Sequence, residues 1–226
     1  MKYIYEFFSI IDIISCAEDQ YMETQQETIL FIVQKHKPTQ NEEFTLHYAS
    51  FIIFQKKEDK LQLVQLQENA TTLSSLPFRV FIGKVVWNQC KDQLTDEEGA
   101  TRLIYSSNLD NDLGFVDKTY KNVVKKKRIH VDDSLVFRKP MICMNRGYGK
   151  GAYAFVVCLL DIQEPYVLEN HVIGIQCTEN NNEMYYKKLI ESLNQQKTKE
   201  FVKIYFGNNM MNITELQHML PIYWKD

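Results

Sequence analysis

The sequence of 226 residues has the size of one large globular domain or two small ones. Hydrophobic residues make up 45% of it and charged residues 24%, which excludes a chain that is disordered throughout. A net charge of −3 excludes a protein that is basic over its whole surface. The apolar run at 3–14 is interrupted by acids and lacks the basic region and cleavage site of a signal peptide. No apolar run reaches the roughly 20 residues of a membrane span, so we expect no membrane association.

Strand patterns dominate the first third of the chain. Residues 27–34 form a short, β-branched run, and 44–55 form a longer run that is rich in aromatic residues. A polar turn at 57–60 separates this run from 61–67, where leucine and glutamine partly alternate. Two such runs joined by a short turn predict a β-hairpin.

The middle of the chain predicts further strands. Residues 78–88 form an apolar run whose Gly83 indicates a bulge or a tight bend. Residues 116–128 are compatible with a helix that frays at its lysine-rich end. The runs at 135–144 and 152–163 predict two more strands, joined by a loop that contains the only glycine cluster of the chain.

The last third predicts one amphipathic helix. In 184–196, Leu189 and Leu193 recur with other apolar residues at a spacing of four, and polar residues occupy the opposite side. Asn180 and Glu183 stand three residues apart, as at a helix start. We therefore expect Leu189 and Leu193 to be buried beneath the strands.

A short tail follows this helix. Residues 201–206 predict a strand, and 212–220 predict a short helix in which Asn212 and Glu215 hold capping positions. All elements together favour a mainly β fold, a barrel with α decorations.

Motifs of the common enzyme classes are absent from the sequence. Asp132 and Asp133 are adjacent, and adjacent acids belong more often to a solvated loop than to a catalytic pair. The five cysteines are widely spaced and match no zinc-binding pattern. Cys143, Cys158 and Cys177 lie in apolar runs, so we expect reduced, buried thiols in a cytosolic or nuclear protein. We expect no catalytic activity, no cofactor and no metal site.

Positive charge is concentrated in one part of the chain. Residues 118–150 contain ten Lys or Arg residues against two acids, a net charge of +8 that leaves −11 for the remainder. Aromatic residues lie between the cations, a combination that suits single-stranded nucleic acid. A solvated lysine-rich loop and an acidic protein partner are the alternative interpretations. We expect 125–150 to be a contact surface outside the core. The candidate binding residues are Lys125, Lys126, Lys127, Arg128, Arg138, Lys139, Arg146, Tyr148 and Lys150.

Two short strings resemble the RNA recognition motif. Residues 104–109 (IYSSNL) are similar to the first ribonucleoprotein signature of that family, and 153–156 (YAFV) are similar to the core of the second. Ser106 replaces an aliphatic residue of the signature, and Cys158 replaces an aromatic one. This resemblance implies direct binding of single-stranded RNA or DNA, and it stays open as an alternative.

A longer resemblance is to the OB-fold family of telomere proteins, which includes the shelterin subunit that recruits telomerase and accessory subunits of ciliate telomerase. Residues 152–168 (AYAFVVCLLDIQEPYVL) are similar to its last barrel strand, which leaves through a turn at Pro165. Residues 185–196 (YYKKLIESLNQQ) resemble the helix that packs under the barrel, and 49–64 resemble the central hairpin. The likeness covers about two thirds of the chain.

This resemblance refines the expected fold to an OB-fold-like β-barrel plus a C-terminal amphipathic helix and a small α/β tail. The barrel would span 1–199, with a basic insertion at about 118–150 and a packing helix at 183–196. Residues 200–226 would form a short strand-helix tail. The insertion and the tail depart from the family pattern.

The resemblance also implies a function and a set of partners. The chain would be a non-catalytic accessory subunit of a telomerase or telomere ribonucleoprotein complex. It would dock the catalytic subunit to other accessory proteins and support telomere repeat synthesis. Its partners would be the telomerase reverse transcriptase, other accessory OB-fold proteins, and telomerase RNA or single-stranded DNA, in the nucleus at chromosome ends. A direct single-strand-binding protein and a small nucleic-acid-processing enzyme are the alternatives.

Overall fold

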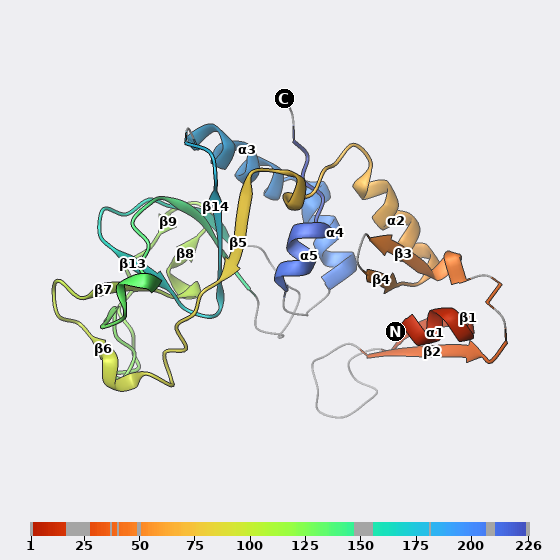
Figure 1. Ribbon diagram of the computed structural model, residues 1–226, viewed down its shortest axis with the longest axis horizontal. Helices are drawn as coiled ribbons and strands as arrows, with labels where there is room; N and C mark the ends of the chain where they lie inside the picture. The colour runs from red at the N-terminus through yellow and green to blue at the C-terminus, as the bar shows by residue number, and fades with distance from the viewer. Residues whose placement is uncertain are drawn as a thin grey trace.

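The computed structural model describes residues 2–16, 28–36, 38–39, 41–48, 51–146, 156–180, 182–206 and 211–224 (Figure 1). It is elongated, with two β-hairpins at one end, helices in the middle and two larger sheets at the other end. It is mainly β with α decorations, as the sequence predicts. No helix among the described residues is long and apolar enough to cross a membrane.

Two antiparallel hairpins form the N-terminal end of the molecule. A short helix precedes the first hairpin, and Ile10 and Ile13 of that hairpin are buried against Phe44 and Phe54. The elements are α1 (Lys2–Phe7), β1 (Ser9–Cys16), β2 (Thr28–Gln34), β3 (Thr45–Tyr48) and β4 (Phe51–Phe54).

Two four-stranded sheets form the opposite end. The first is antiparallel in the order β12-β11-β14-β5, and the second has the order β13-β7-β10-β6, in which β13 and β7 are parallel. β8 and β9 pair with each other as a separate two-stranded antiparallel sheet. The strands are β5 (Phe78–Ile82), β6 (Leu94–Thr95), β7 (Thr101–Ile104), β8 (Leu109–Asp110), β9 (Gly114–Phe115), β10 (Arg128–Ile129), β11 (Met141–Asn145), β12 (Val157–Leu160), β13 (Tyr166–Leu168) and β14 (Val172–Cys177).

Helices connect the two ends and share the largest hydrophobic core with the first sheet. Side chains of the C-terminal helices pack in this core with those of β5, β11 and β14. The α-helices are α2 (Lys57–Gln67), α3 (Glu183–Leu193), α4 (Gln196–Phe206) and α5 (Ile213–His218). The 3-10 helices are η2 (Asn41–Phe44), η3 (Leu73–Ser75), η4 (Lys91–Gln93), η5 (Ser106–Asn108) and η6 (Asp133–Leu135).

The expected hairpin between 44–55 and 61–67 is wrong. The first run is itself a hairpin, β3–β4, and residues 57–67 form α2. Lys, Glu, Gln and Leu are all good helix formers, and Glu58 and Asp59 in the first turn interact favourably with the helix dipole. These preferences outweigh the partial leucine alternation.

The expected strand at 201–206 is also wrong, because these residues belong to α4. Thr198, Phe201 and Val202 are buried, and Tyr205 is partly buried, at the i, i+3, i+4, i+7 spacing of a helix face. The pattern begins before residue 201, so the apolar run alone was too short to reveal it.

The C-terminal helices otherwise follow the sequence pattern. Leu189 and Leu193 of α3 are fully buried in the main core, which confirms the prediction. The helix begins after Asn182, and not at the Asn180 pattern, and it ends at Leu193. Asn212 and Glu215 form the predicted capping box at the start of α5.

Residues 116–128 do not form the expected helix. They run through turns, one of them held by the Asn122 side chain, which accepts from the Val124 amide. In residues 104–109, which resemble the ribonucleoprotein signature, β7 ends at Ile104 and η5 follows at Ser106–Asn108. Among the described residues the sheets do not close into a barrel.

Gly83 marks the predicted change of direction after β5. Its amide donates to the Val172 carbonyl, and its α-carbon lies so close to the backbone of 168–169 that an added Cβ would be 2.2 Å from the Glu169 carbonyl oxygen. Only glycine lets the chain pass here, so the end of β5 is fixed against the end of β13.

Candidate functional site

The structure brings three of the four cations of the basic run to the lining of one cleft. A cleft of about 370 Å³ is lined by Lys125, Lys126 and Lys127 together with Asp96 and Tyr120. Arg128 follows in β10, which pairs with both β6 and β7. The cleft is the candidate nucleic-acid interface that the charge pattern predicts.

Lys125 lies against aromatic rings. Its Nζ is 3.9 Å from the ring centre of Tyr105, 4.6 Å from that of Tyr120 and 5.9 Å from that of Trp87. Burial lowers the pKa of the ammonium, and the charge of Glu169 opposes this effect. Such an ammonium is held by cation–π attraction to its own protein, so it is not a free contact for a phosphate.

Acidic side chains neutralise the other three cations. Lys126 pairs with Asp96 at 3.1 Å, Lys127 pairs with Asp117 at 3.0 Å, and Arg128 pairs with Glu164 at 2.6 Å. These acids lie in sequence outside the run, and nothing in the local pattern indicates that they fold back on it. The run is therefore largely a structural feature that ties surface loops together.

Asp117 pairs with two cations, one of them outside the basic run. Asp117 accepts from the buried Arg102 and from Lys127. Burial raises the pKa of this carboxyl, but its bonds to the two cations outweigh burial and lower the pKa overall. For Asp96, a bond from the Lys127 amide is the main cause of a lowered pKa.

Of the other predicted binding residues, the three that the structure describes, Arg138, Lys139 and Arg146, do not line this cleft. Arg138 pairs with Asp133, and the Lys139 carbonyl accepts from the Tyr166 hydroxyl at 2.6 Å. Arg146 follows β11 directly and is partly buried. Tyr148 and Lys150 lie outside the described residues.

The expectation that 125–150 lies outside the core is wrong in part. Ile129 and the first four residues of β11 are buried. The reason for the burial of β11 is that it lies between β12 and β14 inside the first sheet. The exposed cations of 118–150 that form no ion pair with a described residue are Lys118, Lys121 and Lys139.

An apolar groove lies between the N-terminal hairpins and the C-terminal helices, and no sequence motif indicates it. Its volume is about 560 Å³, within the usual range for ligand sites. All four residues of β4 line one side, and α5 and Ile29 of β2 line the others. Figure 1 shows the β3–β4 hairpin beside α5 and next to the β1–β2 hairpin. The lining residues are Ile29, Phe51, Ile52, Ile53, Phe54, Ile82, Tyr205, Asn212, Ile213, Thr214 and Glu215.

Among the described residues β4 pairs with β3 alone, and its other edge is exposed to this groove. Successive residues of a strand point to opposite faces, so a groove lined by four consecutive residues runs along the edge of the strand. The Gln55 amide donates to the Phe44 carbonyl, which fixes the alternation of bonded pairs in the hairpin. The amide and carbonyl groups of Ile52 and Phe54 therefore point away from β3.

Further apolar side chains are exposed on the neighbouring hairpin. Ile14, Leu30 and Ile32 share its outward face and are between 40% and 51% exposed. Ile29, on the inward face beside the groove, is 52% exposed. Contiguous exposed apolar residues of this kind mark interaction sites more often than isolated ones do.

No group of three or more metal-ligating side chains occurs within the described ranges. The adjacent acids have separate structural roles, since Asp132 caps η6 by accepting from the Ser134 amide and Asp133 pairs with Arg138.

No protein-family model and no curated protein matches this sequence.

Proposed function

We propose that this chain is a non-catalytic docking subunit that binds an extended, apolar segment of a protein partner in the groove beside β4. The observation that carries the proposal is the free edge of β4, which lines an apolar groove of about 560 Å³. A partner strand would gain main-chain hydrogen bonds from Ile52 and Phe54 and bury its apolar side chains. Such strand addition is a common mode of peptide recognition.

The complex that we propose for it is a telomerase or telomere ribonucleoprotein. Support comes from the sequence resemblance to the OB-fold family of telomere proteins, and the finer assignment of the sheets to an OB-fold-like barrel belongs to the same proposal. The chain would link the telomerase reverse transcriptase to other accessory proteins in the nucleus and support telomere repeat synthesis. It would act through protein contacts and would not catalyse a reaction.

Affinity purification of the tagged chain from its own cells tests both parts. We expect mass spectrometry to find one stoichiometric set of proteins that includes a reverse transcriptase, and sequencing to find one bound RNA. Ile29→Glu places a charge in the groove and should reduce recovery of the direct partner at least tenfold. Leu61→Glu is the matched control, because Leu61 is 64% exposed on α2 and does not line the groove.

The outcomes separate the docking proposal from the telomere assignment. Recovery of a different complex that Ile29→Glu disrupts would support docking and contradict the telomere assignment. Equal recovery with wild type, Ile29→Glu and Leu61→Glu would contradict docking at the groove.

Direct binding of single-stranded nucleic acid is the second candidate, favoured by the cleft that Lys125, Lys126 and Lys127 line beside Tyr120. Because these lysines contact aromatic rings or acids, the test uses Lys118 and Lys121, which are exposed and form no ion pair with a described residue. Lys118→Gln with Lys121→Gln should weaken binding and reduce the salt dependence by about one unit of slope for each lost phosphate contact. Unchanged binding of an oligonucleotide by the double variant would contradict this candidate.

A further inference from the structure

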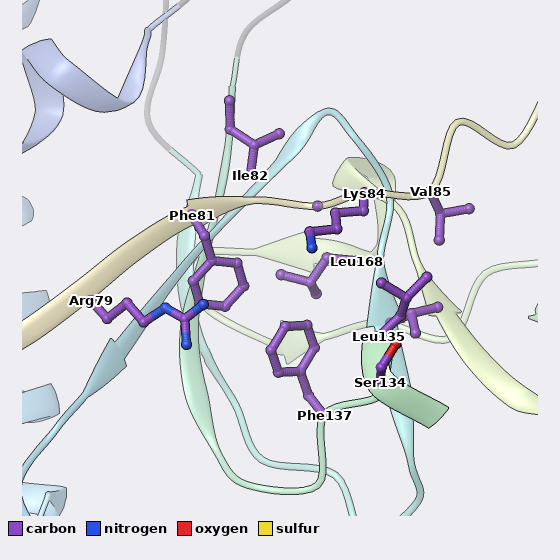
Figure 2. A pocket seen from close by; sticks show the side chains of 11 residues that line it. Arg79, Phe81, Ile82, Lys84, Val85, Ser134, Leu135, Phe137 and Leu168 are labelled. Atoms are coloured by element: carbon purple, nitrogen blue, oxygen red, sulfur yellow. The ribbon is translucent and has the colours of Figure 1, made fainter. Parts of the chain in front are cut away.

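A small cavity lies between β5 and the turn that contains η6; it shares Ile82 with the groove and no lining residue with the cleft. Its volume is about 160 Å³. Figure 2 shows Phe81 and Phe137 at one end, Leu135 and Ser134 at the other, and Leu168 between them. The lining is mostly apolar and contains two cations and no carboxylate. Its residues are Arg79, Phe81, Ile82, Gly83, Lys84, Val85, Ser134, Leu135, Phe137, Val167 and Leu168.

The two phenylalanine rings are held in place before any ligand binds. They are stacked with their centres 5.0 Å apart and their planes 19° apart. Phe81 occupies the space over Gly174, its cross-strand partner, where an added Cβ would be 2.7 Å from the ring. The ring of Tyr166 also packs against Phe137, with the two ring centres 5.9 Å apart. A ligand ring would therefore meet a preformed aromatic wall, which lowers the cost of binding.

Lys84 and Arg79 give the cavity its charge. Both are exposed, and neither forms an ion pair with any residue in the described part of the chain. The guanidinium carbon of Arg79 lies 5.6 Å from the ring centre of Phe81. In Figure 2 the Lys84 side chain extends over Leu168 toward the rings. An ammonium beside an apolar cavity without a carboxylate attracts an anion whose body is apolar.

We propose that this cavity binds a small aromatic carboxylate, with its ring against Phe81 and Phe137 and its carboxylate paired with Lys84. A volume of about 160 Å³ is below the roughly 300 Å³ at which sites for drug-sized ligands begin, so it suits one ring. The ligand is either a free aromatic acid or the carboxyl-terminal aromatic residue of a protein. The proposal does not rest on docking at β4: Ile82 lines both the cavity and the groove, but Lys84, Phe81 and Phe137 line the cavity alone.

Titration with phenylacetate, followed by NMR of the whole protein, tests the proposal. We expect saturable shifts for residues that line the cavity, and at least tenfold weaker binding of the neutral phenylacetamide. Lys84→Met should weaken phenylacetate binding at least tenfold and leave phenylacetamide binding unchanged. Lys91→Met is the matched control, because Lys91 is exposed and does not line the cavity.

Peptides identify the source of the ligand. Tighter binding of a peptide that ends in a free phenylalanine carboxylate than of phenylacetate assigns the site to a protein terminus, and the reverse order assigns it to a small acid. The amidated peptide should bind at least tenfold more weakly than the free acid in the first case. No saturable binding by any acid, or equal binding by Lys84→Met and wild type, would overturn the proposal. Lys84→Met should keep full recovery of the docking partner, which separates the two sites.

Discussion

Lys125 is the clearest residue at which the structure changes the meaning of a sequence signal. In the sequence it belongs to a run of four cations, but in the structure its ammonium contacts Tyr105 and Tyr120. Lys125→Ala should lower the free energy of unfolding by about 1–2 kcal/mol, because the cation–π contacts and the packed stem are both lost. Chemical denaturation measures this change. Lys121 is exposed and forms no ion pair with a described residue, so Lys121→Ala should stay within about 0.5 kcal/mol of wild type. Equal effects of the two variants would contradict a stabilising role for the contacts of Lys125 with the two tyrosine rings.

Asp117 links stability to pH. Its folded-state pKa is below its ordinary value of 3.8, because Arg102 and Lys127 stabilise the carboxylate more than burial destabilises it. Its contribution to stability is therefore complete above the unfolded-state pKa and is lost as the pH falls through the folded-state pKa. Asp117→Asn should be less stable than wild type at neutral pH, and the difference should shrink as the pH falls below about 4. Urea denaturation across this range is the measurement, and a difference independent of pH would contradict the assignment.

The buried thiols should react slowly. Burial raises the pKa of Cys158 to about 11 and that of Cys143 well above its ordinary value, and these two residues lie opposite each other on β11 and β12. Only the thiolate is nucleophilic, so alkylation near pH 8 should label neither residue until the protein unfolds. Cys90, which is partly exposed, should react first among the four free cysteines that the structure describes. Peptide mapping of the labelled sites checks this order, and rapid labelling of Cys143 in folded protein would contradict it.

At the scale of elements, α3 is the helix whose buried face follows most directly from the spacing of its apolar residues. Leu189 is fully buried in the core that α3 shares with the first sheet. Leu189→Ala should therefore cost about 2–5 kcal/mol of stability. Thermal melts of the purified variant measure the loss. A melt like that of wild type would mean that α3 does not pack on the sheet.

The elements also show which sequence signals are reliable. The face of α3 and the capping box before α5 could be predicted because a periodic pattern or a cap is complete within a few residues. The helical nature of 57–67 and 201–206 was missed. A short apolar run fits a strand and a helix equally well, and the decisive residues lay outside it.

The sites were less predictable than the elements. Asp96, Asp117 and Glu164 neutralise the basic run from distant positions, and no local pattern marks a long-range ion pair. The apolar groove combines β2 and β4 with α5, from opposite ends of the chain. Such a surface exists only after folding. The residues that line the groove, and the acids that pair with the basic run, therefore could not be predicted from sequence spacing alone.

At the scale of the whole molecule, the two ends have different roles in our account. The sheets at one end hold the basic cleft, and the hairpins at the other end form one side of the groove. The small charged cavity lies between them and shares Ile82 of β5 with the groove. The C-terminal tail connects the two ends. Ile222 forms a β-bridge with Thr71, which follows α2, and Phe201 and Leu220 lie in the core that the helices share with the first sheet. Partners at the two ends could therefore be held at a fixed separation by one core.

Hydrogen exchange at β4 tests the central claim most directly. In the free protein the amides of Ile52 and Phe54 point away from β3 and should exchange quickly, while the Ile53 amide, bonded within the hairpin, should exchange more slowly. In the complex recovered by affinity purification, docking by strand addition predicts strong protection of Ile52 and Phe54 and little change at Ile53. Unchanged exchange at Ile52 and Phe54 in a complex that contains the full set of partners would contradict docking at this edge.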